Sequence, residues 1–155
     1  MRFSKKLNRF LLLVISALPL LSFTVYANLM SIVGQWQTVD HETNKPSSLI
    51  RIWENHGKYF GEIAKTYSEN PHQSISRCRR CRGNLHNKPI LGMVIIRDLI
   101  AKADKYVDGE ILDPRSGKYY RCQMTVADQG RQLKVRGYIG IPLLGRTDVW
   151  FRIPK

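Results

Sequence analysis

The sequence predicts an all-β fold, a single antiparallel meander closed into a small barrel of about eight strands that follows a signal peptide. Three observations support this prediction. Apolar and polar residues alternate with a period of two over most of the chain after residue 27. Segments rich in Gly, Asn, Asp and Pro separate the alternating runs, as hairpin turns do. The number of runs and their mostly short links suit an up-and-down barrel.

The first 27 residues have the pattern of a secretory signal peptide. Met1–Arg9 carries four basic residues and no acidic one, and Phe10–Leu21 is an apolar run. Val25 and Ala27 then occupy the −3 and −1 positions of an expected cleavage site. An uncleaved membrane anchor is the alternative, but the apolar run is shorter than the roughly 20 residues that span a bilayer. We therefore expect cleavage after Ala27 and export to the periplasm or out of the cell.

The part that remains, residues 28–155, is expected to form one basic domain that does not span the membrane. Removal of the four basic residues of the leader lowers the net charge from +13 to +9. This charge favours acidic partners such as phosphate-bearing surfaces, anionic glycans or nucleic acid. Export argues against nucleic acid as the normal partner. A domain of this size buries about two thirds of its unfolded surface, so it needs no disulfide or metal to fold.

Eight strands are expected in order along this domain. Their ranges are Gln35–Asp40, Leu49–Glu54, Tyr59–Tyr67, Leu91–Arg97, Val107–Leu112, Tyr119–Val126, Leu133–Ile139 and Thr147–Ile153. The alternation is clearest in the last strand, which is therefore expected to be half buried. Its apolar face would consist of Thr147, Val149, Phe151 and Ile153. Its opposite face would carry Arg146, Asp148, Trp150 and Arg152.

The links between strands are mostly expected to be hairpin turns. Asn55–Lys58, Asp113–Gly117 and Ala127–Arg131 each contain a glycine, and Pro114 has the fixed φ that suits a turn. Ser68–Pro89 breaks the alternation and is expected to be a long loop. Long loops in compact domains are uncommon and often functional, so this segment is a candidate site.

The domain carries short motifs that are more specific together than singly. In chain order they are Gly34-Gln35-Trp36, Gly57-Lys58-Tyr59, Cys78-Arg79-Arg80-Cys81-Arg82-Gly83, Pro89-Ile90-Leu91-Gly92, Gly109-Glu110-Ile111-Leu112-Asp113-Pro114, Leu133-Lys134-Val135-Arg136-Gly137-Tyr138-Ile139-Gly140 and Leu143-Leu144-Gly145-Arg146-Thr147. This series resembles a family of exported bacterial proteins, domain of unknown function 2147, over Ser31–Arg152. The family has no established activity, so the resemblance implies an exported location and a fold rather than a reaction.

The Gly-x-Trp at Trp36 and the arginine at Arg152 resemble, more loosely, a feature of lipocalin-like barrels. In those barrels an arginine from the last strand covers the tryptophan of the first strand and closes one end. The resemblance implies a cation–π contact between Trp36 and Arg152, worth about 0.5–2 kcal/mol. Both residues would then be structural.

In an oxidising compartment two of the three cysteines are expected to pair. We favour Cys78–Cys81, because Cys122 falls on an apolar strand face, although a bridge to Cys122 would gain more on the chain-entropy model, about 4 against about 2 kcal/mol. A redox-active pair is an alternative, but such pairs usually begin a helix. Zinc held with His72 and His86 is another, but the spacing fits no common zinc site. We therefore expect no metal and no cofactor.

Two groups of basic and aromatic residues are candidate binding sites. Arg77, Arg79, Arg80 and Arg82 surround the cysteine pair and would form an anion-binding loop, because guanidinium groups pair bidentately with phosphate and carboxylate. An ordinary solvated charge run is the alternative. Arg136, Tyr138, Arg146 and Trp150 lie near the apolar loop Gly140–Gly145 and would line a pocket at one barrel mouth, or else form ordinary pairs with Asp148 on the outer face. The loop would either plug the barrel or serve as a contact patch.

The sequence carries no recognisable catalytic signature, so we expect a protein that is not an enzyme. The leading hypothesis is an envelope β-barrel that binds a small amphipathic or anionic ligand, or an envelope partner. A barrel of about eight strands is either just filled by its side chains or able to hold one small ligand. A solid barrel with a structural or stress-related role, and a redox enzyme that uses Cys78 and Cys81, are the alternatives.

Overall fold

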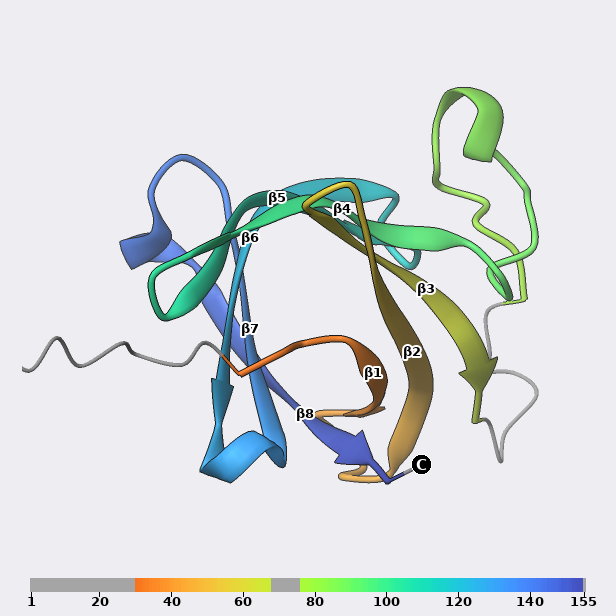
Figure 1. Ribbon diagram of the computed structural model, residues 1–155. Coiled ribbons are helices and arrows are strands. Elements are labelled where there is room, and N and C mark those ends of the chain that lie inside the picture. The colour runs from red at the N-terminus through yellow and green to blue at the C-terminus, as the bar shows by residue number, and fades with distance from the viewer. Residues whose placement is uncertain (1–29, 68–75, 155) are drawn as a thin grey trace, which may run out of the picture.

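The computed structural model describes residues 30–67 and 76–154, which form a closed β-barrel (Figure 1). Its strands are β1 (Gly34–Val39), β2 (Pro46–Asn55), β3 (Lys58–Thr66), β4 (Val94–Lys102), β5 (Lys105–Asp113), β6 (Lys118–Ala127), β7 (Gln132–Tyr138) and β8 (Arg146–Ile153). Three single-turn 3₁₀ helices lie between strands: η1 (Gly83–Leu85), η2 (Asp128–Gly130) and η3 (Pro142–Leu144). The expected signal peptide lies outside the described residues. No helix among the described residues has the length and apolar character needed to cross a membrane.

The strands follow one another around the barrel in sequence order, and each pairs antiparallel with its neighbours. The barrel closes where Trp36 of β1 pairs with Arg152 of β8. The predicted all-β meander is therefore confirmed. Its closure removes the unpaired strand edges that an open sheet would expose.

The predicted range of the fourth strand was wrong, because β4 begins and ends later than Leu91–Arg97. Between the pairs Gly61–Ile96 and Tyr59–Leu99, β4 has one residue more than β3, and Asp98 there has a φ of 59°. This β-bulge interrupts the alternation that the prediction followed. The hairpin that ends β4 has Ala103 at a φ of 53°, so it lacks the glycine that usually marks such a turn.

The predicted faces of the last strand were also wrong. Trp150 of β8 is only 4% exposed and pairs with the buried Leu133, whereas Phe151 is 42% exposed on the outer surface. The face with Arg146 and Asp148 therefore points into the barrel. The tryptophan explains the reversal, because burying its large ring gains more than burying Phe151 or Val149 would.

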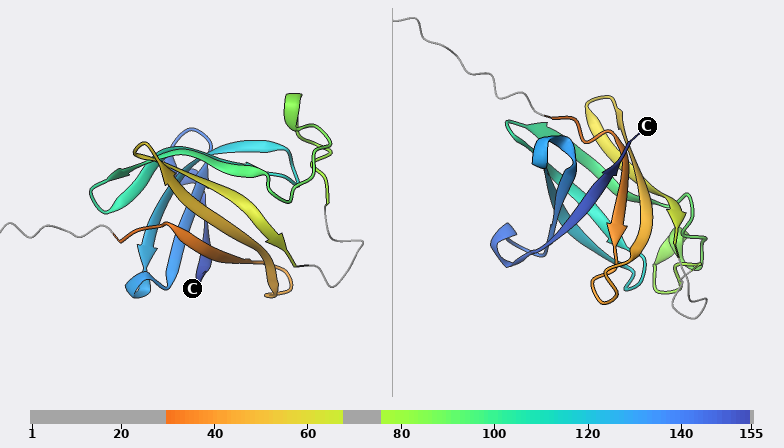
Figure 2. Two further views of the ribbon diagram at one scale, coloured as in Figure 1. Left: turned by 45° about the vertical axis from the view of Figure 1, so that its right-hand side comes forward. Right: turned by 90° about the horizontal axis from the view of Figure 1, so that it is seen from below.

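The two ends of the barrel differ. Residues 30–33 lie across one end, where Trp36 donates from Nε1 to the carbonyl of Ile32 at 2.8 Å and Tyr106 donates from its hydroxyl to the carbonyl of Met30 at 3.2 Å. We call this the closed end. The connections β1–β2, β3–β4, β5–β6 and β7–β8 lie at the opposite, open end, which the right-hand view of Figure 2 shows.

Candidate functional site

The open end leads into a cavity of about 810 Å³ inside the barrel. All eight strands contribute to its wall. The lining residues include Thr38, Ser48, Ile50, Ile63, Ile95, Ile111, Leu112, Tyr120, Val135, Gly137, Tyr138, Arg146, Asp148 and Trp150. The barrel interior is therefore not filled by side chains. This favours a barrel that can hold one small ligand over a barrel that is just filled.

The cavity is apolar in its depth and polar at its mouth. Ile50, Ile63 and Val135 are buried side chains of the wall. Gly137 enlarges the space, because a Cβ built there would meet the nearest atom only at 3.6 Å. His41 lies at the mouth on the β1–β2 loop. This combination suits a ligand with an apolar body and a polar end.

Asp148 fixes the ring of Trp150 in the cavity wall. Its Oδ2 accepts a hydrogen bond from Nε1 of Trp150 at 2.9 Å, and its Oδ1 accepts one from the backbone N–H of Val149 at 2.9 Å. Nε2 of His41 lies 3.3 Å from the same Oδ1. The carboxylate is thus occupied by protein donors. The guanidinium of Arg146, two residues before it on the same face, forms no hydrogen bond or ion pair with any described residue.

The four residues expected to line a mouth pocket have two different placements. Tyr138, Arg146 and Trp150 line the cavity. Arg136 lies outside it and donates to the carbonyl of Pro142 at 2.6 Å, the carbonyl of Leu143 at 3.0 Å and the hydroxyl of Thr147 at 2.7 Å. Arg136 therefore holds the β7–β8 loop in place, and it pairs with two loop carbonyls and a hydroxyl rather than with Asp148.

The β7–β8 loop does not plug the barrel. Leu143 and Leu144 at its tip are 81% and 78% exposed. Arg136 holds the backbone of the loop beside the barrel mouth, where Leu144 lines the rim and Leu143 lies outside the lining. The alternative of a contact patch is the one that this geometry favours.

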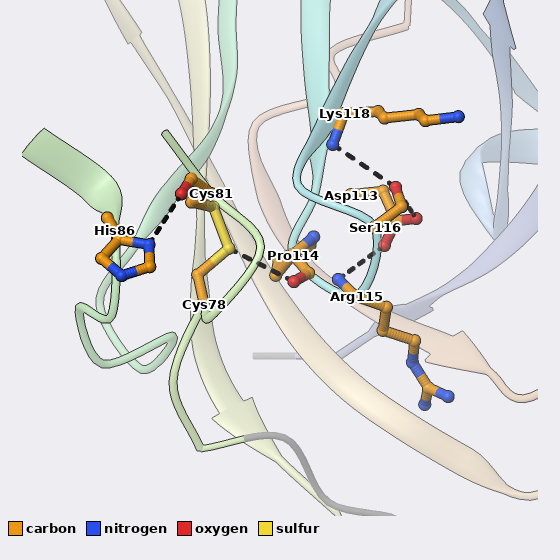
Figure 3. Close-up of a disulfide and its surroundings, with 8 residues drawn as sticks. All are labelled: Cys78, Cys81, His86, Asp113, Pro114, Arg115, Ser116 and Lys118. Carbon is orange, nitrogen blue, oxygen red and sulfur yellow. Dashed lines mark hydrogen bonds between the residues drawn. A yellow bond between two sulfur atoms is a disulfide. The ribbon is translucent and has the colours of Figure 1, made fainter. Parts of the chain in front are cut away.

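The β3–β4 connection carries the disulfide, which joins Cys78 to Cys81 as the sequence favoured. Figure 3 shows it against the β5–β6 turn, with Sγ of Cys78 3.2 Å from the carbonyl oxygen of Pro114. Both cysteines are buried, at 0% and 4% exposure, which favours a structural role over redox chemistry. Nδ1 of His86 lies 3.0 Å from the carbonyl oxygen of Cys81, and His72 lies outside the described residues.

The arginines around the disulfide are of two kinds. Arg77 donates to the carbonyl of Asn87 at 2.9 Å and so is part of the loop structure. Arg79, Arg80 and Arg82 are exposed, and their guanidinium groups have no partner among the described residues. Of the four arginines predicted to form an anion-binding loop, three therefore have free guanidinium groups. They lie at the same barrel end as the cavity mouth.

Arg152 and Trp36 meet at the closed end. The guanidinium carbon of Arg152 lies 4.1 Å from the centre of the Trp36 ring. Arg152 also donates to the carbonyls of Gly130 at 2.6 Å, Ser31 at 2.7 Å and Val33 at 3.0 Å. One side chain thus fixes two segments, residues 31–33 and the η2 turn, over the core and away from the cavity.

The sequence reasoning missed most of the cavity wall. Thr38, Ser48, Ile111 and Asp148 belong to it, yet none was selected as a site residue. The signal available was position: each lies near the strand end that faces the open end. Position along a strand identifies a cavity residue only when the order of the strands and the inward face of each strand are known.

Cys122 should be an unreactive thiol in the folded protein. It is fully buried inside the barrel, and burial raises the pKa of its thiol from 9.0 to about 12. We expect a thiol reagent to modify no cysteine in the native chain near neutral pH and one cysteine after unfolding. Above about pH 9 the unfolded chain loses this proton first, so this thiol lowers stability as the pH rises.

A Cys122→Ala variant should show no reactive thiol even when unfolded. Two or three reactive thiols in the unreduced, unfolded wild type would contradict the disulfide assignment.

The comparisons with known proteins agree with this architecture. A solved structure titled "Protein HP1028 from the human pathogen Helicobacter pylori belongs to the lipocalin family" superposes with a TM-score of 0.68. It is 22% identical, and the alignment covers 81% of this chain and 85% of that chain, so the likeness shows a lipocalin-like fold. No curated protein matches the chain. The family model described as "Uncharacterized protein conserved in bacteria (DUF2147)" matches residues 34–152, and the chain therefore belongs to this family.

Proposed function

We propose that this protein is an exported binding protein that holds a small amphipathic molecule with an anionic end in its barrel. The observation that carries the proposal is the open cavity of about 810 Å³, whose volume is typical of a small-ligand site. A solid barrel with a purely structural role would leave no such space. The buried disulfide supports export, because disulfides persist in oxidising compartments, and the leader pattern of residues 1–27 agrees with it.

The distribution of polar groups supports an anionic ligand end. The two acidic side chains of the wall, Asp113 and Asp148, already accept hydrogen bonds from protein donors. The basic side chain, Arg146, has no partner among the described residues and lies at the mouth. An apolar chain would lie against Ile50, Ile63 and Trp150 while a carboxylate or phosphate pairs with Arg146.

Filling the cavity should abolish binding without unfolding the barrel. In Gly137→Phe the new ring would enter the cavity, because a Cβ at this position makes only ordinary contacts with Tyr120 at 3.6 Å and Ile111 at 3.8 Å. We expect at least about tenfold weaker binding of cis-parinaric acid, a fluorescent fatty acid, with an unchanged thermal midpoint. Gly137→Ala is the matched control and should bind as the wild type does.

The same titration tests the anionic end of the ligand. Arg146→Gln should weaken binding of the fatty acid but not of its methyl ester, because only the acid offers a charge to the guanidinium. Equal affinity of Gly137→Phe and wild type for the acid would refute binding inside the barrel. An unchanged preference for the acid in Arg146→Gln would refute the role of Arg146.

A further inference from the structure

We propose that the open end of the barrel docks on the surface of an anionic lipid bilayer. In this arrangement the apolar residues of the β7–β8 loop enter the interface between headgroups and acyl chains. The arginines of residues 77–82, which we call the disulfide loop, pair with lipid phosphates. The inference concerns the outside of the barrel end. It rests on observations other than those that support a ligand in the cavity.

Exposed apolar side chains are concentrated on the β7–β8 loop. Four large ones occur within six residues of chain: Ile139, Ile141, Leu143 and Leu144. Scattered single exposed apolar residues are ordinary, but a contiguous group usually contacts a partner or a membrane. Leu143 and Leu144 are the two most exposed large hydrophobic residues of the described chain.

Several backbone groups at the tip of this loop already have hydrogen-bond partners within the protein. The carbonyls of Pro142 and Leu143 accept hydrogen bonds from Arg136. The N–H of Leu144 donates to the carbonyl of Ile141 at 3.2 Å, and the N–H of Gly145 donates to that of Pro142 at 3.0 Å. Backbone groups without partners are costly in a lipid environment, so these bonds lower the cost of inserting the loop tip.

The charges at the same barrel end complement anionic headgroups. Arg79, Arg80 and Arg82 are exposed and unpaired within the described residues. The neighbouring acids are largely occupied: the carboxylate of Asp40 accepts three hydrogen bonds within its own loop, and that of Asp113 accepts two within its turn. Glu42 is the remaining exposed acid of the β1–β2 loop. These carboxylates keep their negative charge, as does Asp148, but Arg77, Lys88, Arg115 and Arg146 lie at the same end besides the three arginines, so the surface is net positive. Each arginine near an anionic membrane adds about 1 kcal/mol, or about fivefold in affinity.

The two loops lie on different sides of the cavity mouth. Ile139 and Leu144 line the mouth from the β7–β8 side, and Pro114 lines it from the β5–β6 side, where it contacts Cys78. The right-hand view of Figure 2 shows both loops at the end away from the β2–β3 and β4–β5 hairpins. A flat partner such as a bilayer would touch both loops at once, and a small soluble anion would not.

Flotation with lipid vesicles tests the proposal. The purified protein should float with vesicles of phosphatidylglycerol and phosphatidylcholine, and less with increasing salt, but not with vesicles of phosphatidylcholine alone. Leu143→Glu should reduce the bound fraction by about tenfold, because it places a charge in the interface. The combined variant Arg79→Gln, Arg80→Gln, Arg82→Gln should reduce it by about tenfold or more.

Matched controls make the same changes elsewhere. Phe151→Glu, on the outer face of β8, should bind vesicles as the wild type does. The combined variant Lys102→Gln, Lys105→Gln, Lys134→Gln removes the same charge from other parts of the barrel and should lose less than about twofold. Gly137→Phe should also float normally, so a failure of ligand binding and a failure of membrane docking are distinguishable.

Absence of flotation with anionic vesicles would overturn the proposal. So would flotation that responds to the arginine variant and not to Leu143→Glu, because that result describes a surface that binds phosphate without inserting into a bilayer. Equal flotation of the wild type and both open-end variants would overturn it as well.

Discussion

Trp36→Ala is expected to lower the free energy of unfolding by about 3–5 kcal/mol, the largest effect of any single substitution considered for this barrel. Trp36 is completely buried and is the largest of the fully buried side chains. Its removal leaves a void under Arg152 and also removes the hydrogen bond to Ile32. Urea unfolding followed by circular dichroism measures the loss.

Two companion variants identify the cause of this loss. Trp36→Phe keeps a ring beneath the guanidinium and should lose clearly less stability than Trp36→Ala. Arg152→Ala leaves the carbonyls of Ser31, Val33 and Gly130 without their donor and should cost about 2–4 kcal/mol. The effects of Trp36→Ala and Arg152→Ala should not add, because the two side chains are in contact. Strictly additive losses would show that their contact contributes nothing.

Gly117→Ala should release the disulfide loop from the barrel. Gly117 has a φ of 69°, which costs about 1–2 kcal/mol for a residue with a Cβ. Its added Cβ would also overlap the peptide between Arg80 and Cys81, since the carbonyl oxygen of Arg80 is the nearest atom and the carbonyl carbon the next. Backbone atoms have no rotamer with which to avoid this clash. We expect a further loss of about 1–3 kcal/mol, because the loop must move away.

Limited trypsin digestion should report the release directly. Arg79, Arg80 and Arg82 would become accessible in an extended form, and cleavage there should accelerate by about tenfold. Gly57→Ala is the matched control, because Gly57 has a φ of 75° and its added Cβ meets nothing within 4 Å. It should show the backbone cost alone and no faster cleavage in the disulfide loop. Equal effects of the two variants would mean that the loop does not rest on Gly117.

Local features of the fold were predictable from the sequence because their causes are local. In the turn Asp113–Gly117, the N–H of Gly117 donates to the carbonyl of Asp113 at 2.8 Å, and the Asp113 carboxylate accepts from the backbone of Arg115 and the hydroxyl of Ser116. Each partner is within four residues. The same holds for the pairing of Cys78 with Cys81, whose spacing alone brings the sulfurs within reach.

Features that depend on distant neighbours were not predictable. Both faces of β8 carry residues that suit a barrel interior, and only the pairing of Trp150 with Leu133 decides which one is buried. The bulge at Asp98 depends on how β4 meets Gly61 across the sheet. The cavity requires that Gly137 and small side chains such as Ser48 border the same space from strands far apart in sequence. No pattern within one strand records that arrangement.

The contacts of Arg152 have a consequence for how the molecule is made. Synthesis produces this residue after β1 to β7, yet it fixes Ser31 and Val33, which precede β1. Until β8 has been synthesised, β1 lacks one of its two neighbouring strands. The ring of Trp36 also lacks the guanidinium of Arg152 that lies over it. Maturation of the barrel is therefore a late, post-synthetic event, as contacts between distant parts of a chain generally are.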